Sequence, residues 1–356
     1  MGDPVHNHTL RSMVIVLLLF AVIGGIAGFL WAAPRWTATD RDRVVAARME
    51  PYQQLNLKDF EDATPSHYYV DMRLIAQYVR EGEYAKPPGV DAAGIPFIDH
   101  THDVVVTDLD SATYDPITIS QYALGRYEEY LHGEEAAITD FLIQAEWLRD
   151  HLEHDGTLPI GFAVPSRDLE PGWISAMAQG EAISVFVRAY VETADEEYLA
   201  AALSAFEPFT RSVQEGGVTC RDEAGTWLEE YPQYPPSHVL NGEIYAAFGL
   251  CDLLRVTDDD IVRELLDDTA DTLVDNLYRY EHDGWVIYEL GSDQLAGKTY
   301  YPLQIDQLRA LGALVNDDRI TSIANRWAEP LEHESRWLIK RSFVRARERI
   351  EAKLGD

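Results

Sequence analysis

Residues 174–193 read ISAMAQGEAISVFVRAYVET, and nearly every position is apolar or small, as it also is in residues 238–255, HVLNGEIYAAFGLCDLLR. A helix that is apolar on all sides is buried, whereas a surface helix is apolar on one stripe only. Residues 135–153 and 260–280 have that second pattern, with an acidic outer face. The alternation predicts inner and outer layers of helices, and it favours an incomplete or full α/α toroid over a simple bundle.

Helical periodicity continues along most of the chain. Asp115 followed by Pro116 has the residue types of an N-cap and a first helical position. Further helices are expected at residues 117–132, 196–214, 303–315, 318–329 and 333–353. We therefore expect residues 111–356 to form one all-α domain, whose inter-helix loops gather at one mouth.

The N-terminal part has a different organisation. After a tail of residues 1–12, residues 13–33 run for 21 positions without a charge, which is long enough to cross a hydrocarbon core of about 30 Å. The run exceeds the apolar region of a signal peptide and no small-x-small cleavage site follows it, so we expect a single-pass signal anchor. Residues 34–110 are predicted to be a polar connector with short strands.

The charge balance indicates habitat and excludes one class of partner. The chain has 61 acidic and 29 basic residues, a net charge of −32, and its few cations are mostly arginine. Such an acidic surface makes nucleic acid an improbable partner and is typical of proteins from concentrated brine. Cys220 and Cys251 are too few for a disulfide scaffold, and one bridge or two free thiols are both compatible with the sequence.

Three junctions between a loop and a helix have residue types that are unusual for surface loops. They are residues 169–184, LEPGWISAMAQGEAIS; residues 227–242, WLEEYPQYPPSHVLNG; and residues 285–308, which contain WVIYEL and KTYYPLQIDQL. Proline fixes φ, so the prolines of the second junction would hold Glu230 and Tyr231 rigidly before a helix. Solvated loop residues and tight helix packing are the plain alternatives.

These junctions, together with the segment YDPITISQY at residues 114–122, resemble blocks of the C-terminal catalytic domain of the D-glucuronyl C5-epimerases. The resemblance covers residues 110 to about 330, with the blocks in the same order. It implies an α/α toroid that inverts C5 of glucuronate within a polysaccharide or protein-linked glycan, giving iduronate. It also implies a membrane anchor formed by one N-terminal helix.

The chemistry sets three requirements. C5 of a uronate lies next to a carboxylate, so the enzyme must neutralise that carboxylate, supply a base on one face of the ring and supply an acid on the other. No cofactor and no metal are needed. By resemblance the catalytic residues are Glu230, Tyr231, Tyr288 and Tyr300. We expect Glu230 and Tyr300 to be the opposed acid and base, with the other two as hydrogen-bonding support.

A second group of residues is predicted to bind the substrate or to supply positive charge. These residues are Gln179, Arg188, His238, Asn241, Lys298 and Arg309. One departure from the animal members of the family is the dipeptide Gly291-Ser292, which stands where they have Arg-His. Tyr301 could replace Tyr300 if the preceding loop aligns differently.

Two other functions use the same features. A polysaccharide lyase would form the same C5 carbanion and expel the 4-O substituent, whereas an inactive glycan-binding protein would bind without exchange at C5. The Asp99–Asp103 cluster has metal-ligand residue types but is interpreted as a polar turn rather than a metal site. The basic residues of 333–353 are interpreted as a solvated helix or a contact for anionic lipid or glycan. Arginines after residue 33 favour a cytoplasmic body, but a glycan substrate favours the outer face of the membrane. A homodimer is left open.

Overall fold

The computed structural model describes residues 67–81, 88–99, 112–282, 285–292, 294–297 and 300–329, and all of them lie in one compact unit, Glu50–Asp356. Several predicted features lie outside the described residues: the tail 1–12, the anchor 13–33, much of the connector 34–110, most of the Asp99–Asp103 cluster, Lys298 and the basic helix 333–353. Among the residues that are described, no helix is both long and apolar enough to cross a membrane.

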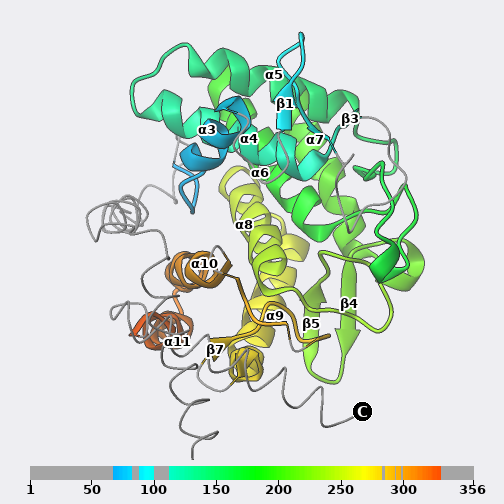
Figure 1. The fold of residues 1–356 in the computed structure, drawn as a ribbon, viewed down its shortest axis with the longest axis vertical. Helices are drawn as coiled ribbons and strands as arrows, with labels where there is room; N and C mark the ends of the chain where they lie inside the picture. The colour runs from blue at the N-terminus through cyan, green and yellow to red at the C-terminus, as the bar shows by residue number, and fades with distance from the viewer. Residues whose placement is uncertain are drawn as a thin grey trace, which may run out of the picture. The chain divides into compact units, whose positions relative to one another are not determined.

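Helices dominate the described part of the chain, and they follow one another in packed pairs. The pairs are α4 (Pro116–Leu131) with α5 (Ala137–Asp150), α6 (Ala176–Thr193) with α7 (Glu196–Phe206), α8 (Leu240–Val256) with α9 (Asp260–Asn276), and α10 (Tyr300–Leu314) with α11 (Asp318–Ala328). The first helices of the pairs also pack in series, α4 on α6, α6 on α8 and α8 on α10 (Figure 1).

The predicted inner layer is confirmed by burial. Every residue from Ala176 to Ala189 in α6 and from Leu240 to Leu253 in α8 is buried. Close approach of the two helices depends on glycine, because a Cβ on Gly180 would collide with the backbone of Ala246. The fold is thus mostly helical as predicted, and closure of the series into a toroid stays a prediction.

The inner helices run in the same direction, so their N-termini lie at one end. Gly180, early in α6, meets Ala246, early in α8, and Arg188 later in α6 pairs with Asp252 later in α8. The side chain of Gln121, early in α4, likewise bonds to the early α6 residue Glu181. One end of the inner layer is therefore formed by helix N-termini and the loops that precede them.

Side-chain caps begin most of these helices where the sequence predicted. Asp115 accepts hydrogen bonds from the backbone N–H groups of Ile117 and Thr118 at the start of α4, and Ser175 accepts one from Ala178 at the start of α6. The predicted helix 196–214 is wrong at its C-terminal end. There α7 ends at Phe206 and gives way to the 3-10 turn η3 (Glu207–Thr210), because Pro208 has no N–H to continue the helical ladder.

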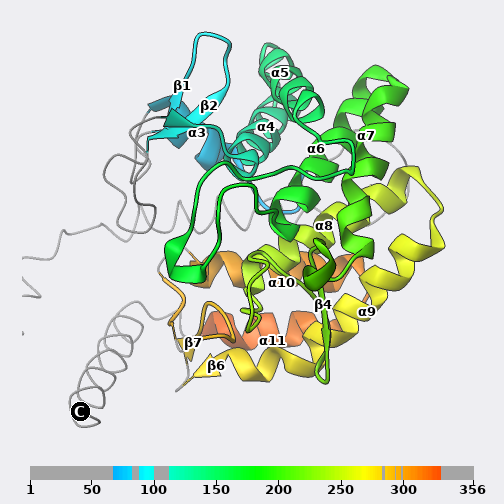
Figure 2. The same ribbon diagram turned by 90° about the vertical axis from the view of Figure 1, so that its right-hand side faces the viewer.

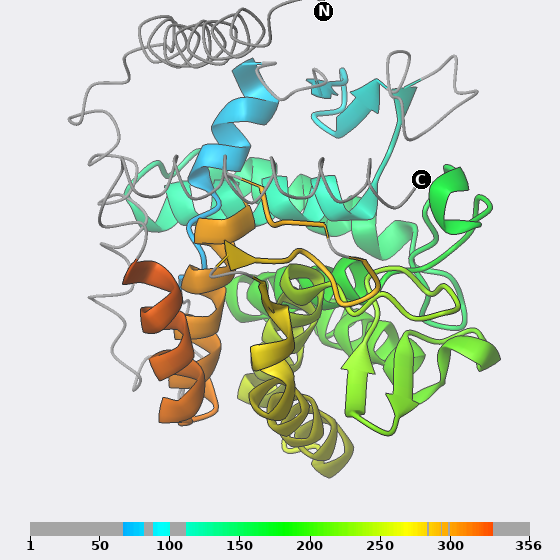
Figure 3. The ribbon, with the colours of Figure 1, turned by 60° about the horizontal axis from the view of Figure 1, so that its bottom comes forward.

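The strands are short and peripheral. In the predicted connector, β1 (Pro88–Val90) and β2 (Pro96–Asp99) pair antiparallel, and β3 (Ala112–Thr113) joins them (Figure 2). The connector also contains a helix, α3 (Arg73–Glu81), that the sequence reading missed and that packs on α4. Two hairpins were also not predicted, β4 (Thr219–Asp222) with β5 (Gly225–Leu228) and β6 (Glu281–His282) with β7 (Trp285–Val286). Figure 3 shows β4 and β5 beside α9.

Both cysteines are free thiols. Cys220 lies in β4 and Cys251 in α8, and both are buried. Burial raises the pKa of the Cys220 thiol to about 11 and that of Cys251 further, so neither is a thiolate at neutral pH. The two thiols therefore act as small apolar core groups.

Candidate active site

The structure brings the four predicted catalytic residues into one group. The hydroxyl of Tyr288 donates to Oε1 of Glu230 over 3.4 Å, and the hydroxyl of Tyr231 also hydrogen-bonds to that carboxylate. The ring of Tyr300 meets the ring of Tyr288 edge to face, with 4.9 Å between centroids. We call these four side chains the Glu230 cluster.

The exposed fraction of the side chains rises from Glu230 through Tyr288 to Tyr300. Glu230 is 5% exposed and Tyr288 is 8% exposed, whereas Tyr300 is 42% exposed. A ligand that enters from solvent therefore meets Tyr300 first and the carboxylate last. This order suits a reaction whose base must be shielded from water while its partner exchanges protons with the solvent.

The position of Glu230 is fixed by the backbone bonds of its neighbour Glu229 and by the start of α8. It follows β5, and the preceding residue Glu229 accepts from the N–H of Ala176 at the start of α6 and donates its own N–H to the carbonyl of Val218. The carboxylate then packs on the first turn of α8 at Gly242, where a Cβ would collide with Oε2 of Glu230. Glycine at this position is what lets the helix start approach the carboxylate.

The two tyrosines of the third junction are positioned differently. Tyr288 is fixed by its backbone, which donates to the carbonyl of Gln294 over 2.7 Å and accepts from the N–H of Leu240 over 3.4 Å. Tyr300 is the first residue of α10. The neighbouring Tyr301 is buried, stacks on Trp285 and donates to the carbonyl of Trp327 over 2.8 Å. Tyr300, rather than Tyr301, is therefore the tyrosine that joins the Glu230 cluster.

An arginine that the sequence reading missed lies against the cluster. The guanidinium of Arg167, in the 3-10 turn η2 (Pro165–Arg167), lies 3.9 Å from the ring centroid of Tyr231. It donates to Oε2 of Glu289 over 2.7 Å and to Oε1 of Gln233 over 3.0 Å. No local motif marks Arg167, because it comes from a loop more than sixty residues before Glu230 and meets it only in the fold.

The electrostatics of the cluster distinguish Glu230 from its tyrosine neighbours. Burial raises the pKa of Glu230 to about 7, although hydrogen bonds from Tyr231 and Tyr288 and the charge of Arg167 oppose the shift. Burial, and then the nearby Glu230, hold the pKa values of Tyr231 and Tyr288 well above their usual range. At neutral pH, Glu230 is thus poised to gain or lose a proton, while Tyr231 and Tyr288 stay neutral hydrogen-bond donors.

Two predicted substrate-binding residues serve the core instead. The amide of Gln179 accepts from the N–H of Leu158 over 2.7 Å and donates to the carbonyls of Gly156 and Ala205, so it ties two loops to α6. Arg188 is 1% exposed and pairs with Asp252 over 2.6 Å. Asp252 lies ten residues along α8 from Gly242, which is about 15 Å at the helical rise. Neither side chain is placed to contact a glycan.

His238 and Arg309 are also engaged elsewhere. The ring of His238 stacks on Trp227 at 4.1 Å, with Nδ1 2.6 Å from Oε1 of Glu229, so it stabilises the loop before α8. Arg309 bonds to Oδ1 of Asn325 over 2.9 Å between α10 and α11. The sequence placed both at the right junctions, but the direction of each side chain depends on neighbours that are distant in the chain.

Asn241 is the predicted binding residue whose position still suits that role. It is buried in the first turn of α8, next to the Gly242 that contacts Glu230. Its carbonyl accepts from Nε2 of Gln307, but its side-chain Oδ1 has no hydrogen-bond partner among the described residues. A buried acceptor without a donor costs free energy, so a donor such as a sugar hydroxyl or a water would stabilise it.

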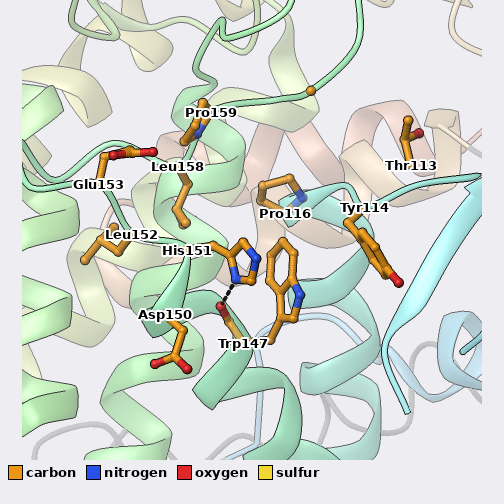
Figure 4. A pocket seen from close by; sticks show the side chains of 11 residues that line it. Thr113, Tyr114, Pro116, Trp147, Asp150, His151, Leu152, Glu153, Leu158 and Pro159 are labelled. Atoms are coloured by element: carbon orange, nitrogen blue, oxygen red, sulfur yellow. Dashed lines mark hydrogen bonds between the residues drawn. The ribbon is translucent and has the colours of Figure 1, made fainter. Parts of the chain in front are cut away.

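A pocket lies near the cluster without including it. It has a volume of about 470 Å³ and is lined by the aromatic side chains of Tyr114 and Trp147, with His151 stacked on Trp147 at 3.7 Å (Figure 4). Its wall at 158–161 continues toward the cluster. The N–H of Ile160 donates to the carbonyl of Trp173 over 2.7 Å, and the ring of Trp173 lies 5.6 Å from that of Tyr231.

Comparison with known proteins shows which proteins this part of the chain is similar to. Residues 154–329 match the family model of the D-glucuronyl C5-epimerase C-terminus. All members of the Glu230 cluster and Arg167 lie within the matched residues. A curated relative, the D-glucuronyl C5-epimerase of Caenorhabditis elegans, is 30% identical over 233 residues. The two findings support assignment of these residues to the C5-epimerase C-terminal domain family.

The matches cover only part of this chain and part of the proteins that it resembles. The alignment with the C. elegans epimerase covers 59% of this chain but 37% of that protein, so the chain spans well under half the length of the relative. A solved structure of a UGL variant with dGlcA-Glc-Rha-Glc is 16% identical, covers 59% of this chain and 62% of that one, and has a TM-score of 0.40. Such a score is too low to bear on whether the helices close into a toroid.

Proposed function

We propose that this protein is an isomerase that inverts C5 of D-glucuronate residues within a glycan, giving L-iduronate. The observation that carries the proposal is Glu230, a buried carboxyl with a pKa of about 7 that hydrogen-bonds to Tyr288 and Tyr231 inside the segment that matches the C5-epimerase family. A carboxyl whose pKa lies near the working pH is suited to proton transfer with carbon.

The proposed reaction uses the two ends of the Glu230 cluster. The ionised Glu230 takes the C5 proton, so that the C–H bond breaks and its electron pair spreads into the substrate carboxylate as an enediolate. The hydroxyl of Tyr300 then gives a proton to the opposite face of C5. Because Tyr300 is partly exposed, it regains its proton from solvent, and Glu230 releases the proton that it took. No bond to the 4-O substituent breaks.

The negative charge that develops on the substrate carboxylate needs donors. Tyr231 and Tyr288 are neutral donors beside Glu230, and the N-termini of α8 and α10 add the positive ends of two helix dipoles. Arg167 supplies a cation, which it shares with Glu289. Arg167 and Ser292 bind the same carboxylate. Ser292 donates to Oε1 of Glu289 over 2.8 Å, and Arg167 donates to Oε2, so Arg167 lies beside the Gly291-Ser292 position where animal members have Arg-His. We infer that Arg167 provides the cation that Gly291-Ser292 lacks.

The pH dependence tests the role of Glu230. If Glu230 is the base in the direction from glucuronate to iduronate, kcat/KM should rise about tenfold per pH unit below pH 7 and level off above it, because only the ionised form accepts a proton. The measurement is C5 proton exchange between pH 5 and 9 at constant salt. A rate that falls through pH 7 would instead make Glu230 the acid in that direction.

The decisive experiment follows hydrogen at C5. The full-length chain is incubated with glucuronate-containing oligosaccharides in D2O at high salt, and deuterium at C5, iduronate and ultraviolet-absorbing unsaturated sugar are measured. We expect deuterium and iduronate together. Deuterium with an unsaturated product would indicate a lyase, and binding without exchange would indicate a glycan-binding protein.

A matched pair of variants tests whether Tyr300 is the second catalytic side chain. Tyr300→Phe removes a hydroxyl from the Glu230 cluster and is expected to slow exchange by about 10²-fold or more. Tyr301→Phe removes the neighbouring hydroxyl, which bonds to Trp327, and should lower thermal stability while leaving kcat close to wild type. The opposite pattern would transfer the role to Tyr301.

The same proposal includes a membrane-anchored protein that works on the outer face of the membrane in concentrated salt. The uncharged run at residues 13–33 supports single-pass anchoring, and a polymeric uronate substrate supports a catalytic part on the outer face of the membrane. The net charge of −32 supports work in concentrated salt. A homodimer would be tested by the mass of the detergent-solubilised protein.

A further inference from the structure

A second group of chemically active side chains lies far from the Glu230 cluster. His67, just before α3, meets Glu128 and His132 at the C-terminal end of α4. One potential metal-ligand atom from each lies within 4.8 Å of the others, and the two imidazole rings are 5.3 Å apart. We call these residues the His67 site.

The separations suit a small divalent ion. Nδ1 of His67 lies 2.8 Å from Oε2 of Glu128, and the ligand atoms of all three residues lie within 4.8 Å of one another. In a tetrahedral zinc site with metal–ligand distances of about 2.0–2.1 Å, two ligand atoms are about 3.3 Å apart. That distance lies between the two observed limits, so small rotations of two half-exposed histidines would close the site.

The surroundings hold the ligands as metal sites commonly do. Oε1 of the buried Glu128 accepts from the backbone N–H of Tyr68, which fixes the carboxylate and leaves Oε2 toward His67. Nδ1 of His132 lies 2.7 Å from the carbonyl of Glu128. As a donor in that bond, Nδ1 leaves the lone pair on Nε2, and such second contacts orient metal-binding histidines.

The local charge also favours a cation. The site lies at the C-terminal end of α4, where the helix dipole is negative. The nearest guanidinium groups are already paired, Arg73 with Asp71 and Arg188 with Asp252. Glu128 is bonded by His67 and lies near His132, while Arg73 acts on its carboxylate only at longer range.

We propose that His67, Glu128 and His132 bind one divalent transition-metal ion, with Zn²⁺ the best match to two imidazoles and one carboxylate, and with water in the fourth position. The metal replaces the proton that His67 shares with Glu128. Because His67 precedes α3 and the other two ligands belong to α4, the ion fastens the segment before α3 onto the helical body.

The His67 site is separate from the proposed chemistry. His132 lies 16 residues after Pro116, which places it about 24 Å along α4 from the N-terminal end of that helix. The Glu230 cluster lies at the end formed by inner-helix N-termini. The proposed metal is therefore structural, and its presence or absence says nothing about C5 inversion.

The test uses the full-length chain, stripped with a chelator and titrated with Zn²⁺ or Co²⁺ in high salt. We expect one ion per chain, a rise in the thermal midpoint with Zn²⁺, and the visible absorption of tetrahedral Co²⁺. His67→Asn and His132→Asn should each weaken binding by at least tenfold and abolish the rise. Both side chains are nearly half exposed, so the variants should fold.

His151→Asn is the matched control. His151 also caps a helix, with Nδ1 2.8 Å from the carbonyl of Trp147, but it does not belong to the His67 site. It should bind Zn²⁺ like the wild type. A thermal shift that persists in both His67→Asn and His132→Asn, or the absence of any stoichiometric binding, overturns the proposal. C5 exchange by the stripped protein is measured separately, so failure of the metal site and failure of the epimerase remain distinguishable.

Discussion

Glu230→Gln is expected to slow C5 proton exchange by about 10²- to 10⁴-fold, the range for loss of a general base. Glutamine keeps the shape of the side chain and can still accept from Tyr288 and Tyr231, but it cannot take a proton from carbon. The measurement is deuterium incorporation at C5 under saturating oligosaccharide. Glu170→Gln, at an exposed glutamate of the first junction, is the control and should be fully active.

The same substitution should not damage the fold, which separates a catalytic role from a structural one. Burial raises the pKa of Glu230 from 4.5 to about 7, so ionisation is disfavoured in the folded state. This unfavourable contribution grows as the pH rises from 4.5 through 7 and then stays constant. Glu230→Gln should therefore be more stable than wild type at pH 8, by up to about 3 kcal/mol, and equal to it near pH 4.5. An inactive variant that is also destabilised at pH 8 would point to a structural role.

Arg188→Met is expected to lower the free energy of unfolding by about 3–5 kcal/mol, because it leaves the carboxylate of Asp252 buried without its main partner. Chemical denaturation at pH 7 and constant salt measures the effect. The exposed pair Arg263–Asp258, with 3.1 Å between its atoms, gives a control, since Arg263→Met should cost at most about 1 kcal/mol.

The Arg188 result also distinguishes a core residue from a substrate ligand. Folded Arg188→Met, assayed well below its midpoint, should retain the wild-type KM for the oligosaccharide because Arg188 is 1% exposed. A raised KM with unchanged stability would restore the substrate-binding role that the sequence suggested. Such a result would also require the path from solvent to Arg188 to open during turnover.

Local sequence signals predicted the helices well, for identifiable reasons. Asp115, the N-cap read from the sequence, acts on backbone groups two or three residues away, so it marks a helix start without tertiary information. Apolar composition on all sides predicted the burial of α6 and α8. In contrast, α3 has no acidic residue in its first turn and belongs to a polar connector, so its role became visible only through its contact with α4.

The sequence did not predict the direction in which several side chains point. His238 and Arg309 have the residue types expected of substrate ligands, but Glu229 and Asn325 turn them toward the protein. The β4–β5 hairpin was missed because each strand has four residues and is surrounded by stronger helical patterns. Tyr300 and Tyr301 are adjacent and chemically identical, so only packing against Trp285 and Trp327 could separate them.

The sequence by itself determined the mostly helical fold, the inner position of α6 and α8, and the junctions that contain Glu230, Tyr231, Tyr288 and Tyr300. Those properties follow from apolar periodicity, caps and motif order, which act within a few residues. The tertiary structure decided that Arg167 lies against Tyr231, that burial brings the pKa of Glu230 to about 7, and that His67 meets Glu128 and His132. Charge, solvation and metal-ligand geometry depend on distances between residues that are 60 or more positions apart, and only the packed chain fixes those distances.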